Sequence, residues 1–126
     1  MQLDPYRAYQ EAQVKTREKG RLVLILYEEA IRYLKEAAKA LREGDAERKG
    51  ERLIYGMEVI SELLSSLDSS QGEIATNLRS LYTFMLQRLL LADAEGDAEK
   101  IDEVTGLLED LREGWREVLE GKGKRR

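Results

Sequence analysis

The stretch LIYGMEVISELLSSL, residues 53–67, places apolar side chains at alternating steps of four and three residues. Because an α-helix makes one turn in about 3.6 residues, side chains at these steps form one apolar stripe along the helix. Such a stripe is the seam by which helices pack side by side in a bundle. The stretch therefore predicts an amphipathic helix over about residues 45–67 that buries its seam against neighbours. The seam consists of Leu53, Met57, Ile60, Leu64 and Leu67.

Three further stretches, at about residues 17–43, 71–94 and 98–120, repeat this apolar spacing. Each is long enough for a helix and none contains proline, so we expect three more helices. The first of them has two adjacent apolar stripes, which is the width needed to contact two neighbours. These stripes are Leu22, Leu26, Ala30, Tyr33, Ala37 and Leu41, and beside them Val23, Tyr27, Ile31 and Leu34.

The joints between the expected helices are short and carry turn residues. Gly44-Asp45-Ala46-Glu47 and Gly96-Asp97-Ala98-Glu99 are nearly identical, and residues 68–72 form a third polar joint. Glycine suits the left-handed position that closes a helix, and the aspartate then caps the next helix. Helices of this length with joints this short must fold back on one another. The sequence therefore predicts an all-α fold, an antiparallel up-down-up-down four-helix bundle over residues 17–120.

Residues 1–16 contain too few aliphatic side chains to join the core. Asp4 and Pro5 form an N-cap and first-turn pair, and Tyr6, Tyr9 and Gln10 follow. The two tyrosines either pack loosely over the bundle or are available to a partner, and both alternatives stay open. We expect this segment to be a short N-terminal cap, fixed or movable, outside the bundle.

The composition removes many kinds of active site. The 126-residue chain has no cysteine and no histidine, which excludes disulfides, thiol nucleophiles, Ser–His triads and metal sites built on these residues. Its 25 acidic residues are by default the solvated faces of helices. There is no phosphate-binding glycine loop and no apolar run that approaches a membrane span. We therefore expect no enzyme, no cofactor, no metal site and no membrane insertion.

The net charge of −4 is unevenly distributed. Residues 120–126 carry four basic side chains and one acidic, so the rest of the chain, with 17 basic and 24 acidic, has a net charge of −7. Because phosphate contacts supply most of the affinity for nucleic acids, an acidic body argues against binding them. We expect residues 121–126 to be a disordered basic tail, with contact to an acidic partner or a membrane surface as the alternative.

A few residues are not needed by a plain bundle. Gly56, Gly106 and Gly114 lie inside expected helices, where each costs about 1 kcal/mol against alanine. Either a neighbouring helix or a bound peptide approaches the backbone there. Asn77 is either a surface amide, a hydrogen-bond partner within the bundle, or a ligand for a peptide backbone. Tyr55 and Tyr82 suit an interface or the edge of the core equally well.

One long stretch also matches a known family. Residues 64–68 read LSSLD, residues 72–78 read GEIATNL, and Leu81-Tyr82, Met85 and Arg88-Leu89 follow at matching spacing. This pattern resembles the signature of the flagellar secretion chaperone family, FliS, and the resemblance spans about residues 6–118. Asp93 stands where the family usually has asparagine.

The resemblance implies a cytosolic export chaperone that binds the disordered C-terminal segment of flagellin, prevents premature polymerisation and delivers it to the flagellar type III export apparatus. For such a chaperone we expect the first and third helices to form the walls of a groove that binds flagellin, and the N-terminal segment to be the lid of that groove. We expect the groove residues to be Leu22, Ile25, Ile74, Asn77, Leu78, Leu81 and Tyr82, and the lid residues to be Tyr6, Tyr9 and Gln10.

A second class of function stays open. The wide apolar arc of the first helix also suits a self-associating adaptor without a client.

For the chaperone, the partners expected are the flagellin segment, the membrane export gate and flagellar regulatory factors. In either case we expect the chain to be a monomer or a homodimer.

Overall fold

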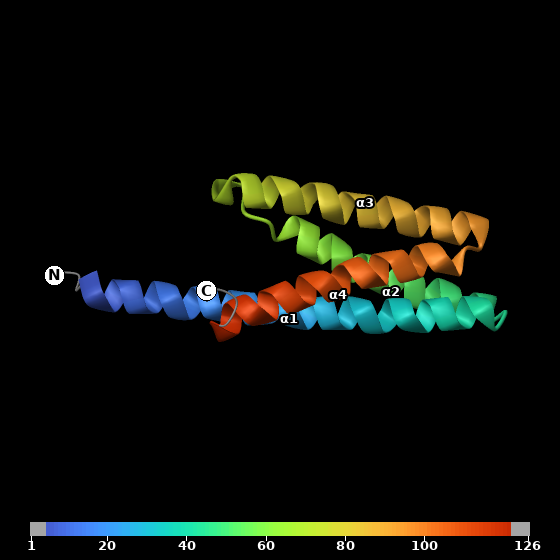
Figure 1. Ribbon diagram of the computed structural model, residues 1–126, viewed down its shortest axis with the longest axis horizontal. Coiled ribbons are helices and arrows are strands. Elements are labelled where there is room, and N and C mark those ends of the chain that lie inside the picture. The colour runs from blue at the N-terminus through green and yellow to red at the C-terminus, as the bar shows by residue number, and fades with distance from the viewer. Residues whose placement is uncertain (1–4, 122–126) are drawn as a thin grey trace.

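The computed structural model describes the backbone of residues 5–121 and the side chains of residues 17–121. In this range the chain forms four α-helices and one short 3₁₀ turn, η1, and no strand (Figure 1). In chain order the elements are α1 (Pro5–Arg42), α2 (Ala46–Ser65), η1 (Ser69–Gln71), α3 (Glu73–Glu95) and α4 (Ala98–Glu120). The predicted all-α class is confirmed.

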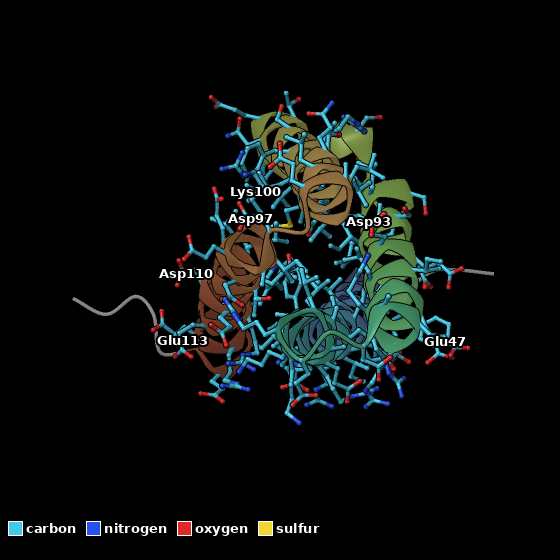
Figure 2. All side chains as sticks on the ribbon, turned by 90° about the vertical axis from the view of Figure 1, so that its right-hand side faces the viewer. Glu47, Asp93, Asp97, Lys100, Asp110 and Glu113 are labelled. Atoms are coloured by element: carbon cyan, nitrogen blue, oxygen red, sulfur yellow. The ribbon has the colours of Figure 1, made fainter. Side chains whose placement is uncertain are left out.

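The four helices stand at the corners of a bundle. Helix α1 packs against α2 and α4, and α3 packs against the same two helices from the opposite side. Seen from the end that holds the α1–α2 and α3–α4 joints, α1 and α3 lie diagonally across the bundle (Figure 2). Successive helices run in opposite directions, so the predicted up-down-up-down topology is confirmed.

The two similar joints have the geometry expected from their residues. Gly44 has φ +79° and Gly96 has φ +65°, both in the left-handed region that favours glycine. The Asp45 carboxylate accepts a hydrogen bond from the backbone N–H of Arg48, and the Asp97 carboxylate accepts one from Glu99. Asp97 also lies beside Lys100, with a carboxylate oxygen 2.9 Å from the ammonium nitrogen (Figure 2). The capping interpretation is confirmed at both joints.

Helix α1 differs from the expectation at its start. It begins at Pro5 rather than near Arg17, and no break in the backbone separates residues 5–16 from the rest of the helix. Proline is compatible with the first helical turn, and no proline follows it to end the helix. In Figure 1 the blue N-terminal part of α1 projects beyond the ends of the other helices.

The core follows the second apolar stripe of α1 more than the first. Tyr27, Leu34 and Ile31 of the second stripe are buried, whereas Leu22, which opens the first, is 55% exposed. Ala30 and Ala37 of the first stripe are buried as well, so both stripes contribute to the core and the first is exposed most at Leu22. The other fully buried large side chains are Ile60, Leu63, Tyr82, Met85, Leu89, Ile101, Val104 and Leu108.

Helices α1 and α2 approach each other closely at Gly56. A Cβ atom added to Gly56 would lie 2.6 Å from the Cδ2 atom of Leu34 and 3.6 Å from the Cβ atom of Tyr33. At this position the neighbouring helix explains the glycine.

Candidate functional site: a groove between α3 and α4

A groove of about 650 Å³ opens at the end of the bundle opposite the two capped joints. It lies where the beginning of α3 diverges from the end of α4, on the left of Figure 1. Ile74, near the start of α3, is 65% exposed, whereas its neighbour Ala75 and, further along the helix, Met85 and Leu89 are buried. All four helices contribute to the groove.

The lining is mostly apolar and changes character at its edge. The apolar and aromatic residues are Val23, Leu63, Leu67, Ile74, Leu78, Tyr82, Leu111, Trp115 and Val118. Val118 is 69% exposed, so apolar side chains reach the mouth of the groove from both α3 and α4. The exposed polar residues of the lining are Lys19, Ser66, Asp68, Gln71, Asn77 and Asp110.

One carboxylate of this polar edge is held in its charged form. Hydrogen bonds from Ser70 lower the pKa of Asp68, and the positive charge of Lys19 adds to that effect. Asp68 is therefore ionised at neutral pH. The groove thus has an apolar interior and a charged margin, the usual division of a protein-binding surface.

A hydrogen-bonded trio from three helices lies beneath the apolar surface. The indole N–H of Trp115 on α4 donates to the hydroxyl of Tyr27 on α1, at 3.0 Å. The Tyr27 and Tyr82 hydroxyl oxygens are 2.6 Å apart, which joins α1 to α3 across the core. Burial raises the pKa of both phenols, so both remain protonated at neutral pH.

Glycine 114 leaves the α4 side of the groove open. It is exposed, it lines the groove, and a Cβ atom added to it would meet no described atom within 4 Å. Gly106, on the same helix but outside the lining, also has no neighbour within that distance. Among the described residues, no neighbouring helix accounts for either glycine.

The structure brings together part of the predicted site. Ile74, Asn77, Leu78 and Tyr82 line the groove, and Leu81 is half-buried outside its lining. Within the described part of the chain, the Asn77 amide has no hydrogen-bond partner.

The residues expected from α1 lie elsewhere. Leu22 and Ile25 are both more than half exposed and outside the lining, to which α1 contributes Lys19, Gly20 and Val23 instead. The expected lid residues are Tyr6, Tyr9 and Gln10, and their side chains lie outside the described residues.

Sequence reasoning missed the contribution of α4 to the groove. Leu111, Gly114, Trp115 and Val118 form this side. A signal was present in the unexplained Gly114, which lies one turn from Leu111 and one turn from Val118 on the same face.

The arrangement suits noncovalent binding. In the described part of the chain no group of three or more acidic residues is placed to hold a metal ion. Nor does any helix there have the length and apolar character needed to cross a membrane. The groove has an apolar surface for contact with a partner, the hydrogen-bonded trio of Trp115, Tyr27 and Tyr82 beneath that surface, and charged residues at its margin.

Comparison with known proteins identifies the family. The family model for the flagellar protein FliS matches residues 2–122. A relative in Bacillus subtilis is 33% identical over 123 residues, which is 98% of this chain and 92% of the relative. A relative in Salmonella typhimurium is 38% identical over 110 residues, covering 86% and 82% of the two chains. Both are named flagellar secretion chaperone FliS, a non-enzymatic role, as the sequence predicted. The chain therefore belongs to the flagellar protein FliS family.

Proposed function

We propose that this protein is a cytosolic export chaperone that holds the C-terminal segment of flagellin in the groove between α3 and α4. By covering that segment it prevents premature polymerisation and delivers the subunit to the flagellar type III export apparatus. The observation that carries the proposal is the groove of about 650 Å³, lined by apolar side chains and open at the end of the bundle. Membership of a family of flagellar secretion chaperones supports the identity of the client.

The groove has the properties that a disordered client requires. A disordered segment loses conformational entropy when it binds, so it must bury a large apolar surface to compensate. Ile74 on α3 and Val118 on α4 are each about two-thirds exposed and face a common groove. An amphipathic guest helix laid between α3 and α4 would remove both side chains from water.

The N-terminal segment enters this mechanism as a movable lid. Tyr6 lies 13 positions before the groove residue Lys19 on the continuous helix α1, a distance of about 20 Å along a straight helix. To cover the groove, α1 has to bend or unwind between these residues. Tyr9 and Gln10 lie on the intervening turns. In the structure these turns continue α1 beyond the bundle, so the closed lid is a second conformation, which the guest displaces.

Trp115 provides a direct test, because it is the only tryptophan in the sequence and it lines the groove. A synthetic peptide of the flagellin C-terminal segment is titrated into the protein while the emission of Trp115 is recorded. Calorimetry in parallel gives the heat-capacity change. We expect a saturable change in emission and a negative heat-capacity change, the mark of apolar burial. A scrambled peptide should produce neither.

A pair of variants on α3 localises the binding. Ile74→Asp puts a charge in the groove, and Leu90→Asp puts one on an equally exposed position outside it, since these residues are 65% and 59% exposed. We expect Ile74→Asp to weaken the peptide at least tenfold and Leu90→Asp to leave its affinity within about twofold. Equal effects of the two substitutions would place the client elsewhere.

Export itself is tested in a flagellated bacterium. The chaperone is recovered from the cytosol, and flagellin is expected to come with it from the wild type but much less from Ile74→Asp. Secretion of flagellin should fall in parallel. Recovery of the wild-type chaperone without flagellin would refute the proposed client.

Self-association is the competing function, and one observation favours it. Leu22 and Ile25 are exposed on α1 outside the groove, where they leave apolar surface uncovered. Sedimentation separates the two functions. A tight homodimer that persists on addition of the flagellin peptide, with no change in Trp115 emission, would favour the adaptor.

A further inference from the structure

The hydrogen-bonded trio of Trp115, Tyr27 and Tyr82 contains one more hydrogen than its own bonds use. Trp115 supplies one N–H, and Tyr27 and Tyr82 supply one O–H each. One hydrogen is used between Trp115 and the Tyr27 oxygen, and one between the two hydroxyl oxygens. One hydroxyl hydrogen therefore has no acceptor among the described residues.

The surroundings decide which hydroxyl keeps that hydrogen. Tyr27 is 0% exposed and does not line the groove, so a spare hydrogen on it would be buried without an acceptor. If Tyr27 instead donates to Tyr82, the spare hydrogen lies on Tyr82, which is also nearly fully buried, at 1% exposed, but contributes to the lining of the groove. The bonds then run in one direction, from Trp115 through Tyr27 to Tyr82. Hydrogen bonds arranged in this way polarise one another, which makes the last hydroxyl a better donor.

We propose that the Tyr82 hydroxyl donates this hydrogen to a main-chain carbonyl oxygen of the guest bound in the groove. The inference builds on the proposed function and adds to it the polar contact that fixes the guest's register. Apolar contact alone tolerates sliding, whereas a single buried donor selects one position along the guest.

The same contact restricts the conformation of the guest. In the middle of a helix every main-chain carbonyl already accepts a hydrogen bond, whereas the last turn leaves its carbonyls without partners. An extended segment also has free carbonyls. A carbonyl without a partner is the stronger acceptor, so we expect the guest residue over Tyr82 to lie at the C-terminal end of a guest helix or in an extended stretch.

Three variants test the contact by titration with the flagellin C-terminal peptide. Tyr82→Phe removes the donor and should weaken binding about three- to tenfold. Tyr27→Phe breaks the same internal bond but keeps the Tyr82 hydroxyl, so its loss of affinity should be smaller. Tyr33→Phe is the unchanged control, because the Tyr33 ring packs against Tyr55 outside the groove. Thermal midpoints of all variants show that each is folded.

Peptides with single ester bonds in place of main-chain amides identify the acceptor, since an ester carbonyl accepts hydrogen bonds less well. One ester position should weaken binding to the wild type but not to Tyr82→Phe. An alanine scan of the guest tests the alternative that Tyr82 donates to a guest side chain. If one alanine substitution weakens binding to the wild type but not to Tyr82→Phe, the acceptor is that side chain and the main-chain assignment is overturned. If the wild type binds the peptide and Tyr82→Phe binds it equally well, this inference fails while the proposed function stands. No binding by the wild type would defeat the proposed function itself.

Discussion

Replacing Gly114 by alanine should make this protein more stable and a poorer chaperone. The added methyl group meets no described atom within 4 Å, so the free protein accommodates it without strain. Alanine is favoured over glycine inside a helix by about 0.5–1 kcal/mol. For a domain of this size, we expect the midpoint of thermal unfolding to rise by about 2–5 °C.

The same methyl group should interfere with the guest. Gly114 lies between Leu111 and Val118 on the α4 side of the groove, so on the proposed function we expect a bound segment to pack against the helix backbone there. Inserting a methyl group into a packed contact costs about 1–3 kcal/mol, part of which a guest recovers by shifting. A net loss of about 1–2 kcal/mol weakens the flagellin peptide about five- to thirtyfold.

Gly106→Ala is the matched control on the same helix. It also has no neighbour within 4 Å of the added Cβ, but it lies outside the groove. Both variants should therefore gain stability in a far-ultraviolet circular dichroism melt, and only Gly114→Ala should lose affinity in the Trp115 titration. If Gly114→Ala binds the peptide as tightly as Gly106→Ala does, the guest does not pack on α4 at this position and the reasoning is refuted.

Other changes test the fold, a joint and the lid. Gly56→Ala places a methyl group 2.6 Å from Leu34. The overpacking costs about 1–3 kcal/mol and should lower the thermal midpoint despite the gain in helix propensity. An unchanged midpoint would refute the close approach of the two helices. A hydrogen bond from Lys100 lowers the pKa of Asp97 below its ordinary 3.8, so its charged form stabilises the fold above that pH. Asp97→Asn should therefore lower the midpoint at pH 7, and its difference from the wild type should shrink as the pH falls below about 4; a difference independent of pH would contradict this. Deleting residues 1–12 should change the calorimetric affinity and enthalpy of the flagellin peptide, and the lid fails if both stay the same.

Local signals predicted most of the fold. The bounds of α4, Ala98–Glu120, match the expectation, because Asp97 caps its start and Gly121 closes its end with a positive φ. The predicted start of α1, near Arg17, is wrong for the opposite reason. Residues 5–16 are weakly amphipathic, and nothing between Pro5 and Arg17 stops a helix, so the length of α1 follows from backbone propensity rather than from an apolar seam.

The site was harder to predict, because core and groove positions share one periodicity. Leu78 and Leu81 belong to the same apolar series, yet only Leu78 lines the groove. Tyr82, directly after Leu81, lines the groove as well, so the difference lies in which face of α3 meets the groove. That face is set by how the helices pack together, which a single stretch of sequence does not encode. The sequence shows Gly114 as an unexplained glycine inside a helix, and only the structure shows that no described neighbour fills the space beside it.

The asymmetry of α3 links the fold to the proposed task. Near the α3–α4 joint, Met85 and Leu89 are buried, Arg88 pairs with Glu103 of α4, and Asp93 pairs with Lys49 of α2. At its other end the same helix leaves Ile74 to solvent. A guest that fills the groove therefore completes the core at its open end and ties α3 to α4.

Binding should consequently stabilise the whole bundle, because the guest binds the folded state alone. At a peptide concentration of about one hundred times Kd the gain is about 2.7 kcal/mol, or roughly 8–13 °C in the thermal midpoint. Hydrogen exchange should slow most at the start of α3, around Ile74, which is 65% exposed in the free protein, and much less around the buried Met85 and Leu89. Uniform protection along α3 would mean that the guest does not close the open end of the bundle.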